Sequence, residues 1–137
     1  MPKSVMTNAE KILVYSCSGC SNVAQLANVI AVSLDRQGLA EMSCIAGVGG
    51  DVKGLVKVAK SGRAICAIDG CALACVKHSL KRHGIIPAWH IELTQLGLKK
   101  SKGEDCTARE RGKAIRHVYE TLRIVDPECE KSLDRLD

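Results

Sequence analysis

Two short apolar segments of this chain each end in a turn that carries a pair of cysteines. Residues 11–16 run into Cys17-Ser18-Gly19-Cys20, and residues 63–68 run into Asp69-Gly70-Cys71, with Cys75 four residues further on. Short apolar blocks that are partly β-branched are typical of strands covered on both faces. Two thiol pairs at two strand ends, about fifty residues apart, therefore predict one four-thiolate site assembled from two halves.

The rest of the chain alternates between strand and helix patterns. Ser21 or Asn22 is suited to cap the first helix, and Gly38 is suited to end it. Gly47-Val48-Gly49-Gly50 lacks a phosphate-binding pattern, so we expect a flexible loop there. Pro87 should lie at the beginning of the last strand, since proline donates no ladder hydrogen bond. The expected strands are residues 11–16, 42–46, 63–68 and 85–93, and the expected helices are residues 21–37, 51–60, 72–82 and 106–122.

This alternation predicts an α/β fold, in which a three-layer α/β/α sandwich surrounds a mostly parallel four-stranded sheet. Right-handed crossovers place the strand-to-helix turns along the carboxyl edge of such a sheet. In a flavodoxin-like order 2-1-3-4, strands one and three are neighbours, and the crevice between their ends is the usual ligand site. Cys17 and Cys71 would then face each other across that crevice.

Length and cysteine usage predict one intracellular domain. We expect an N-terminal lead at residues 1–10, a single metal-binding domain at residues 11–125 and a polar tail at residues 126–137. The first ten residues lack an apolar signal segment, so the eight cysteines favour metal binding, redox chemistry or burial in a reducing cytoplasm over a disulfide framework. No apolar run approaches the length that crosses a bilayer, so we expect no membrane partner.

The net charge of +5 is modest, and we interpret the basic residues between 99 and 116 as solvated surface. Nucleic-acid binding would call for a basic groove with aromatic stacking platforms or a known motif. The chain has only three aromatic residues besides histidine, so we expect no nucleic-acid partner. A metal ion is the expected partner, and the oligomeric state stays open.

The spacing of the paired cysteines suits a tetrahedral thiophilic ion, of which zinc is the first choice. Both Cys17-x-x-Cys20 and Cys71-x-x-x-Cys75 fall within the usual separation of zinc ligands. If Cys71 opens a helix, Cys75 lies one turn further on the same side. The positive ends of the following helices should lower the pKa values of these thiols. Sulfur ligands leave open which metal is bound and whether the site is structural, catalytic or for metal transfer.

These residues also carry a resemblance to a known family. Cys17-Ser18-Gly19-Cys20-Ser21-Asn22, Asp69-Gly70-Cys71-Ala72-Leu73-Ala74-Cys75 and the segment Trp89-His90-Ile91-Glu92-Leu93 resemble the DGC-domain family, which is named for its Asp-Gly-Cys motif. The resemblance spans residues 11–125. It implies zinc binding through Cys17, Cys20, Cys71 and Cys75, and it supplies no reaction.

Two enzyme classes compete with metal binding. A Cys-x-x-Cys that opens a helix after a strand is also the arrangement of thioredoxin-like thiol-disulfide oxidoreductases, with Cys17 attacking and Cys20 resolving. Such an enzyme leaves the second cysteine pair unexplained. A phosphatase or arsenate-reductase loop with Cys17 as nucleophile needs an arginine for the oxyanion, and residues 22–25 contain none. Whether the chain is an enzyme stays open.

The remaining cysteines have plainer interpretations. Cys44 and Cys66 fall inside expected strands, where a free cysteine is commonly a small buried hydrophobe. Cys44 is also a candidate to approach the crevice from strand two. Cys106 and Cys129 lie in or beside polar segments, so we expect both thiols to face solvent.

Among the other polar residues, His78 is a candidate additional ligand, because it follows Cys71 by seven residues on the same helical face. A histidine at that depth along a helix more often hydrogen-bonds a neighbour. Asp69 is expected to accept backbone hydrogen bonds at its turn rather than to act as a base. The histidines without ligand spacing are His83, His90 and His117.

Overall fold

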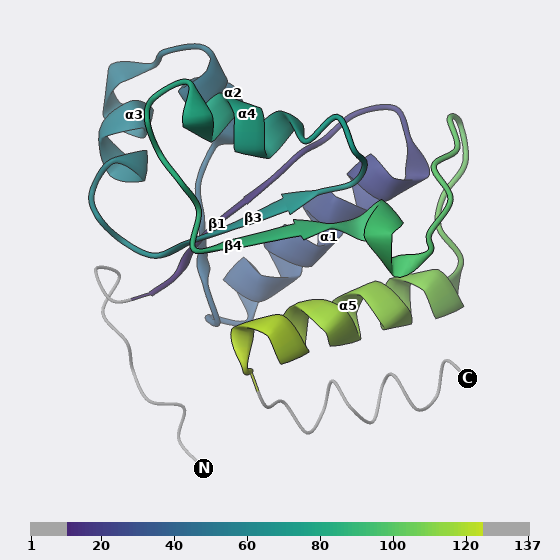
Figure 1. Cartoon of the computed structure of the whole chain (residues 1–137). Helices are drawn as coiled ribbons and strands as arrows, with labels where there is room; N and C mark the ends of the chain where they lie inside the picture. The colour runs from purple at the N-terminus through teal and green to yellow at the C-terminus, as the bar shows by residue number, and fades with distance from the viewer. Residues whose placement is uncertain (1–10, 125–137) are drawn as a thin grey trace.

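The computed structural model describes residues 11–124, so the expected lead and tail, with Cys129, lie outside the described residues. The described part begins with a strand, and helices separate the successive strands as the patterns predict (Figure 1). In order, the elements are β1 (Leu13–Ser16), α1 (Asn22–Arg36), β2 (Glu41–Met42), α2 (Ile45–Gly49), α3 (Lys53–Ala59), β3 (Ile65–Asp69), α4 (Cys75–Lys81), β4 (Trp89–Glu92), the 3-10 helix η1 (Leu93–Leu96) and α5 (Ala108–Leu122).

The four strands form one parallel sheet in the order β2-β1-β3-β4, which confirms the predicted order 2-1-3-4. β1 and β3 are central neighbours, with Tyr15 opposite Ala67 and Ser16 opposite Ile68. Parallel strands point their carboxyl ends the same way. The segments that follow β1 and β3, which carry the two cysteine motifs, therefore leave the sheet at the same edge.

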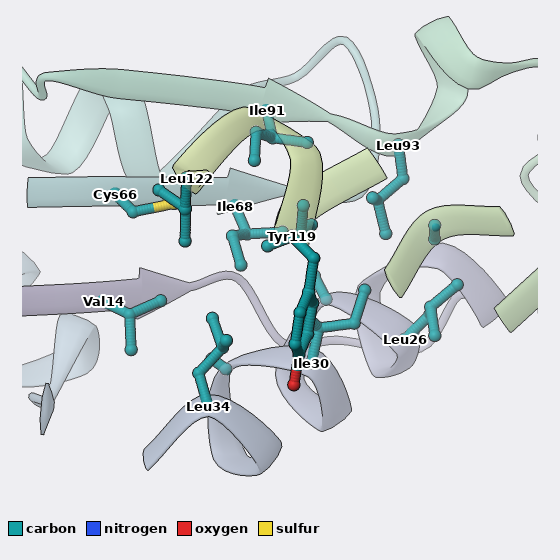
Figure 2. Close-up of a cluster of buried hydrophobic side chains, with 14 of the residues drawn as sticks. Val14, Leu26, Ile30, Leu34, Cys66, Ile68, Ile91, Leu93, Tyr119 and Leu122 are labelled. Carbon is teal, nitrogen blue, oxygen red and sulfur yellow. The ribbon is translucent and has the colours of Figure 1, made fainter. Parts of the chain in front are cut away.

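Helices cover both faces of the sheet, and the side chains of each strand alternate between them. On one face, α1 and α5 enclose a buried cluster that includes Val14, Ile68 and Ile91 (Figures 1 and 2). On the other face, α2, α3 and α4 cover Tyr15 and Ala67. The fold is thus the predicted three-layer sandwich. Each fully buried Leu or Ile contributes about 1.5–3 kcal/mol relative to an exposed one.

The two ends of α1 confirm the expected signals, whereas the cap of α5 was not predicted. The Ser21 hydroxyl accepts a hydrogen bond from the Ala24 amide at 3.1 Å, so Ser21 caps α1, and Gly38 follows the helix with φ at +73°. Thr107 and Glu110 form a capping box at the start of α5. Pro87 lies just before β4, as its missing amide hydrogen requires.

The segment after α1 differs from the prediction. β2 has only two residues, and the expected flexible glycine loop lies largely within α2, which ends at Gly49. A Cβ at Gly47 would lie 2.0 Å from the Leu55 Cδ1 atom, so this glycine is needed for close packing of α2 on α3. Glycine here permits helix packing rather than a flexible turn.

Among the helices of residues 11–124, none combines the length and the apolar character that a membrane crossing needs.

Candidate functional site

Gly70 joins the two cysteine motifs at the carboxyl edge of the sheet. Its backbone amide donates a hydrogen bond to Cys17 Sγ at 3.2 Å, and its carbonyl accepts one from the Thr94 amide at 3.1 Å. A Cβ on Gly70 would lie 2.7 Å from the carbonyl carbon of Val23 and 2.8 Å from the Ala24 nitrogen. Only glycine allows the end of β3 to approach the first turn of α1 so closely.

Cys17 is half-buried at the end of β1, and its amide donates to the Ile68 carbonyl at 3.1 Å. Burial raises the pKa of the Cys17 thiol, the hydrogen bond from Gly70 lowers it, and the negative charges of Asp69, Cys75 and Cys71 raise it further. The expectation that a helix terminus lowers this pKa is therefore wrong, because desolvation outweighs it. Cys17, Cys71 and Cys75 nevertheless lie close enough to act on one another electrostatically.

Cys71 and Cys75 do not lie one helical turn apart. α4 begins only at Cys75, after Ala74 in the left-handed conformation (φ 49°), and Cys71 lies in the turn before it. The Ala74 amide donates to the Cys71 carbonyl at 3.0 Å, which closes that turn. Leu73, between the two cysteines, is 65% exposed, and the Cys75 side chain is exposed as well. The second motif is thus a tight turn that leads into a helix.

The loop between η1 and α5 forms one wall of this site. Asn22 holds it at the start of α1, because its amide group donates to the Lys99 carbonyl at 2.9 Å and accepts from the Ser101 amide at 2.7 Å. This contact brings the Lys100 Nζ atom to 3.4 Å from Cys71 Sγ. Lys100 is exposed, as expected for solvated surface, and its ammonium group also lies beside a thiol.

Cys20 follows β1 and lies beside the loop that leads to α5. Its side chain is exposed, and its carbonyl accepts a hydrogen bond from the Gly103 amide of the same loop at 3.4 Å. Within residues 11–124, no three Cys, His, Asp or Glu side chains form a group able to hold a metal ion. The four-cysteine zinc site therefore stays a prediction.

Asp69 connects three elements beside the thiols. Its carboxylate is 1% exposed and accepts hydrogen bonds from the Val76 amide at 2.8 Å and the Lys77 amide at 3.2 Å, which caps the start of α4. The expected role as an acceptor of backbone hydrogen bonds is confirmed, although the donors lie seven and eight residues away. His90 Nε2 lies 2.8 Å from the same carboxylate. The pairing with His90 was not predicted, because it joins residues 21 positions apart on two neighbouring strands.

The other cysteines divide into buried and exposed thiols. Cys66 is fully buried in β3, as predicted, and burial raises its pKa to about 12. The expectation of a buried Cys44 is wrong, because β2 ends before it and the side chain is exposed at the start of α2. The expectation of a solvent-facing Cys106 is also wrong. Only 6% of it is exposed, it packs in the cluster between the sheet, α1 and α5, and burial raises its pKa.

Two further histidines lie on or after α4. His78 is exposed on the helix, so its proposed role as an additional ligand stays a prediction. His83 lies beyond the end of the helix, where Nε2 is 2.8 Å from the Val48 carbonyl and 3.2 Å from the Asp51 carboxylate. His83 therefore holds the C-terminal end of α4 against α2, at the opposite end of the helix from Cys75.

The fold and the site define an α/β protein whose parallel sheet carries an Asp-Gly-Cys turn at its carboxyl edge. The family model described as DGC domain matches residues 13–118, and the chain belongs to this family. A curated relative is the "Anaerobic and virulence modulator AnvM" of Pseudomonas aeruginosa, which is 59% identical over 115 residues, covering 84% of this chain and 86% of that protein. No solved structure matches the chain.

Proposed function

We propose that this DGC domain binds one zinc ion through Cys17, Cys20, Cys71 and Cys75, in metal homeostasis or sequestration. The observation that carries the proposal is the 3.2 Å hydrogen bond from the Gly70 amide to Cys17 Sγ. It joins a residue of the second motif to a sulfur of the first, and Cys71 is the next residue in the chain. Thiols from the two motifs thus share one edge of the sheet, which a common ligand requires.

The surroundings of these thiols suit a thiolate site. A zinc ion with four thiolates carries a net charge of −2, and the Lys100 ammonium group beside Cys71 would offset part of it. The Gly70 amide would stabilise the Cys17 thiolate in the same way. When bound, zinc would cross-link the end of β1 to the start of α4. Cys20 and Cys75 are exposed, so both side chains are free to turn towards an ion.

The second candidate is a thiol-disulfide oxidoreductase that uses Cys17 and Cys20. An attacking thiol in such an enzyme has a lowered pKa at an exposed helix terminus. Burial raises the pKa of Cys17 instead, which weighs against Cys17 as an attacking thiol. The second cysteine pair, which such an enzyme does not need, favours the metal site.

Elemental analysis of protein made in a reducing cell tests the proposal. We expect about one zinc per chain in the unaltered protein and a loss of most of it in Cys71→Ser or Cys75→Ser. Cys129→Ser is the control, because Cys129 is not among the four predicted ligands, and it should keep its zinc. Equal loss in the control would indicate nonspecific thiol binding. Insulin-disulfide reduction that depends on Cys20 but not on Cys71 would favour the oxidoreductase.

A further inference from the structure

A buried carboxylate and a histidine meet behind the second cysteine motif, where neither is a predicted ligand. In the sheet register, His90 lies opposite Ala67 and Glu92 lies opposite Asp69. Asp69 and His90 are therefore diagonal neighbours, and alternation puts both on the face that α4 covers. His90 belongs to an edge strand, so its side chain remains 23% exposed while that of Asp69 is 1% exposed.

Asp69 is hydrogen-bonded both to the first turn of α4 and to His90 on β4. A carboxylate only accepts, so the amides of Val76 and Lys77 donate to Asp69, and His90 donates through Nε2. The residue that directly precedes α4, Ala74, has a methyl side chain and a left-handed backbone, so it offers no side-chain cap. The start of α4 is fixed instead by Asp69 from the end of β3, and Asp69 is fixed by His90 from β4.

We propose that Asp69 and His90 are positioning residues for Cys75, which is the first residue of α4. The chain of contacts runs from His90 to Asp69, and from Asp69 to the amide of Val76, the residue next to Cys75. Cys17 is fixed separately by the Gly70 amide. His90 therefore controls how well the second motif is held against the first without touching a sulfur. This inference rests on the proposed zinc site for its effect on affinity, whereas its effect on α4 is independent of zinc.

Amide hydrogen exchange on the metal-free chain tests the positioning directly. In His90→Phe, which keeps a ring but removes the donor, we expect the amides of Val76 and Lys77 to exchange about tenfold faster or more. In His90→Gln, whose side-chain amide can still donate, exchange should return towards the unaltered rate. Unchanged exchange in His90→Phe would overturn the proposal, whatever the zinc content of the protein.

Zinc affinity by competition with a chelator provides the second readout. Outer residues that orient metal ligands typically contribute 10- to 100-fold to affinity, so His90→Phe should weaken zinc by about that factor and His90→Gln by less. His83→Phe is the control, because His83 is also hydrogen-bonded beside α4 but at its other end. It should lower the unfolding temperature and leave zinc affinity unchanged.

The outcomes separate the two proposals. If the unaltered chain binds no zinc but His90→Phe still speeds exchange at Val76 and Lys77, the zinc proposal fails and the positioning of α4 stands. If zinc binds equally well to the unaltered chain and to His90→Phe, the positioning of Cys75 for zinc fails and the zinc site stands. Equal weakening of zinc in His90→Phe and His83→Phe would mean that general stability, not placement of Cys75, sets the affinity.

Discussion

The Gly70→Ala substitution tests the close backbone approach of β3 to α1. The new Cβ would lie 2.7 Å from the Val23 carbonyl carbon and 2.8 Å from the Val23 oxygen and the Ala24 nitrogen. At distances below 3.0 Å, the neighbouring atoms have to move apart. All three are backbone atoms of the first turn of α1, so no side-chain rotation relieves the contact. Overpacking of this kind costs about 1–3 kcal/mol, and we expect the upper half of that range. For a chain of this size, that lowers the midpoint of thermal unfolding by roughly 10 °C.

Gly54→Ala is the matched control for the same change. Gly54 belongs to α3, and apart from its chain neighbours and the backbone of its own helix, no described atom lies within 4 Å of a Cβ built there. Alanine should therefore stabilise the protein by about 0.5–1 kcal/mol through its higher helix propensity. Urea or thermal unfolding followed by circular dichroism measures both variants. A Gly70→Ala protein that unfolds at the same midpoint as the unaltered chain would refute the close approach of β3 to α1.

Three further predictions follow from the structure. The folded chain keeps the Cys66 proton up to about pH 12, whereas the unfolded chain loses it near pH 9.0. The free energy of unfolding should therefore fall by up to about 1.4 kcal/mol per pH unit between these values. In urea unfolding at several pH values, Cys66→Ala should show a shallower fall. Asn22→Ala removes two hydrogen bonds to the 99–101 loop and should cost about 1–3 kcal/mol in the same assay. Iodoacetamide at neutral pH, followed by mass spectrometry, should label exposed Cys44 much faster than buried Cys106, and comparable rates would contradict the assigned burial.

Local patterns in the sequence were sufficient to predict the layers, the strand order and the edge that carries the thiols. The apolar block before Cys17 predicts β1, and the helical spacing of apolar residues after Ser21 predicts α1. Both patterns depend only on residues close together in the sequence. Cys66 was also assigned correctly, because a cysteine in the middle of an apolar strand is buried by the strand itself.

The contacts that sequence reasoning missed join residues far apart in the chain. Lys100 approaches Cys71 only because Asn22 holds a loop that begins 77 residues later. Cys106 is buried by packing of α1 and α5, although its neighbours in the sequence are polar. Local propensity carries no information on such contacts. Asp69 shows the same limit, since its turn was predicted but its long-range partner His90 was not.

X-ray absorption at the zinc edge tests the central claim, that the two cysteine motifs share one ion. For protein purified from a reducing cell, we predict four sulfur neighbours at about 2.3 Å. A spectrum dominated by nitrogen or oxygen neighbours, or a protein that carries no zinc while its cysteines are reduced, would contradict the account.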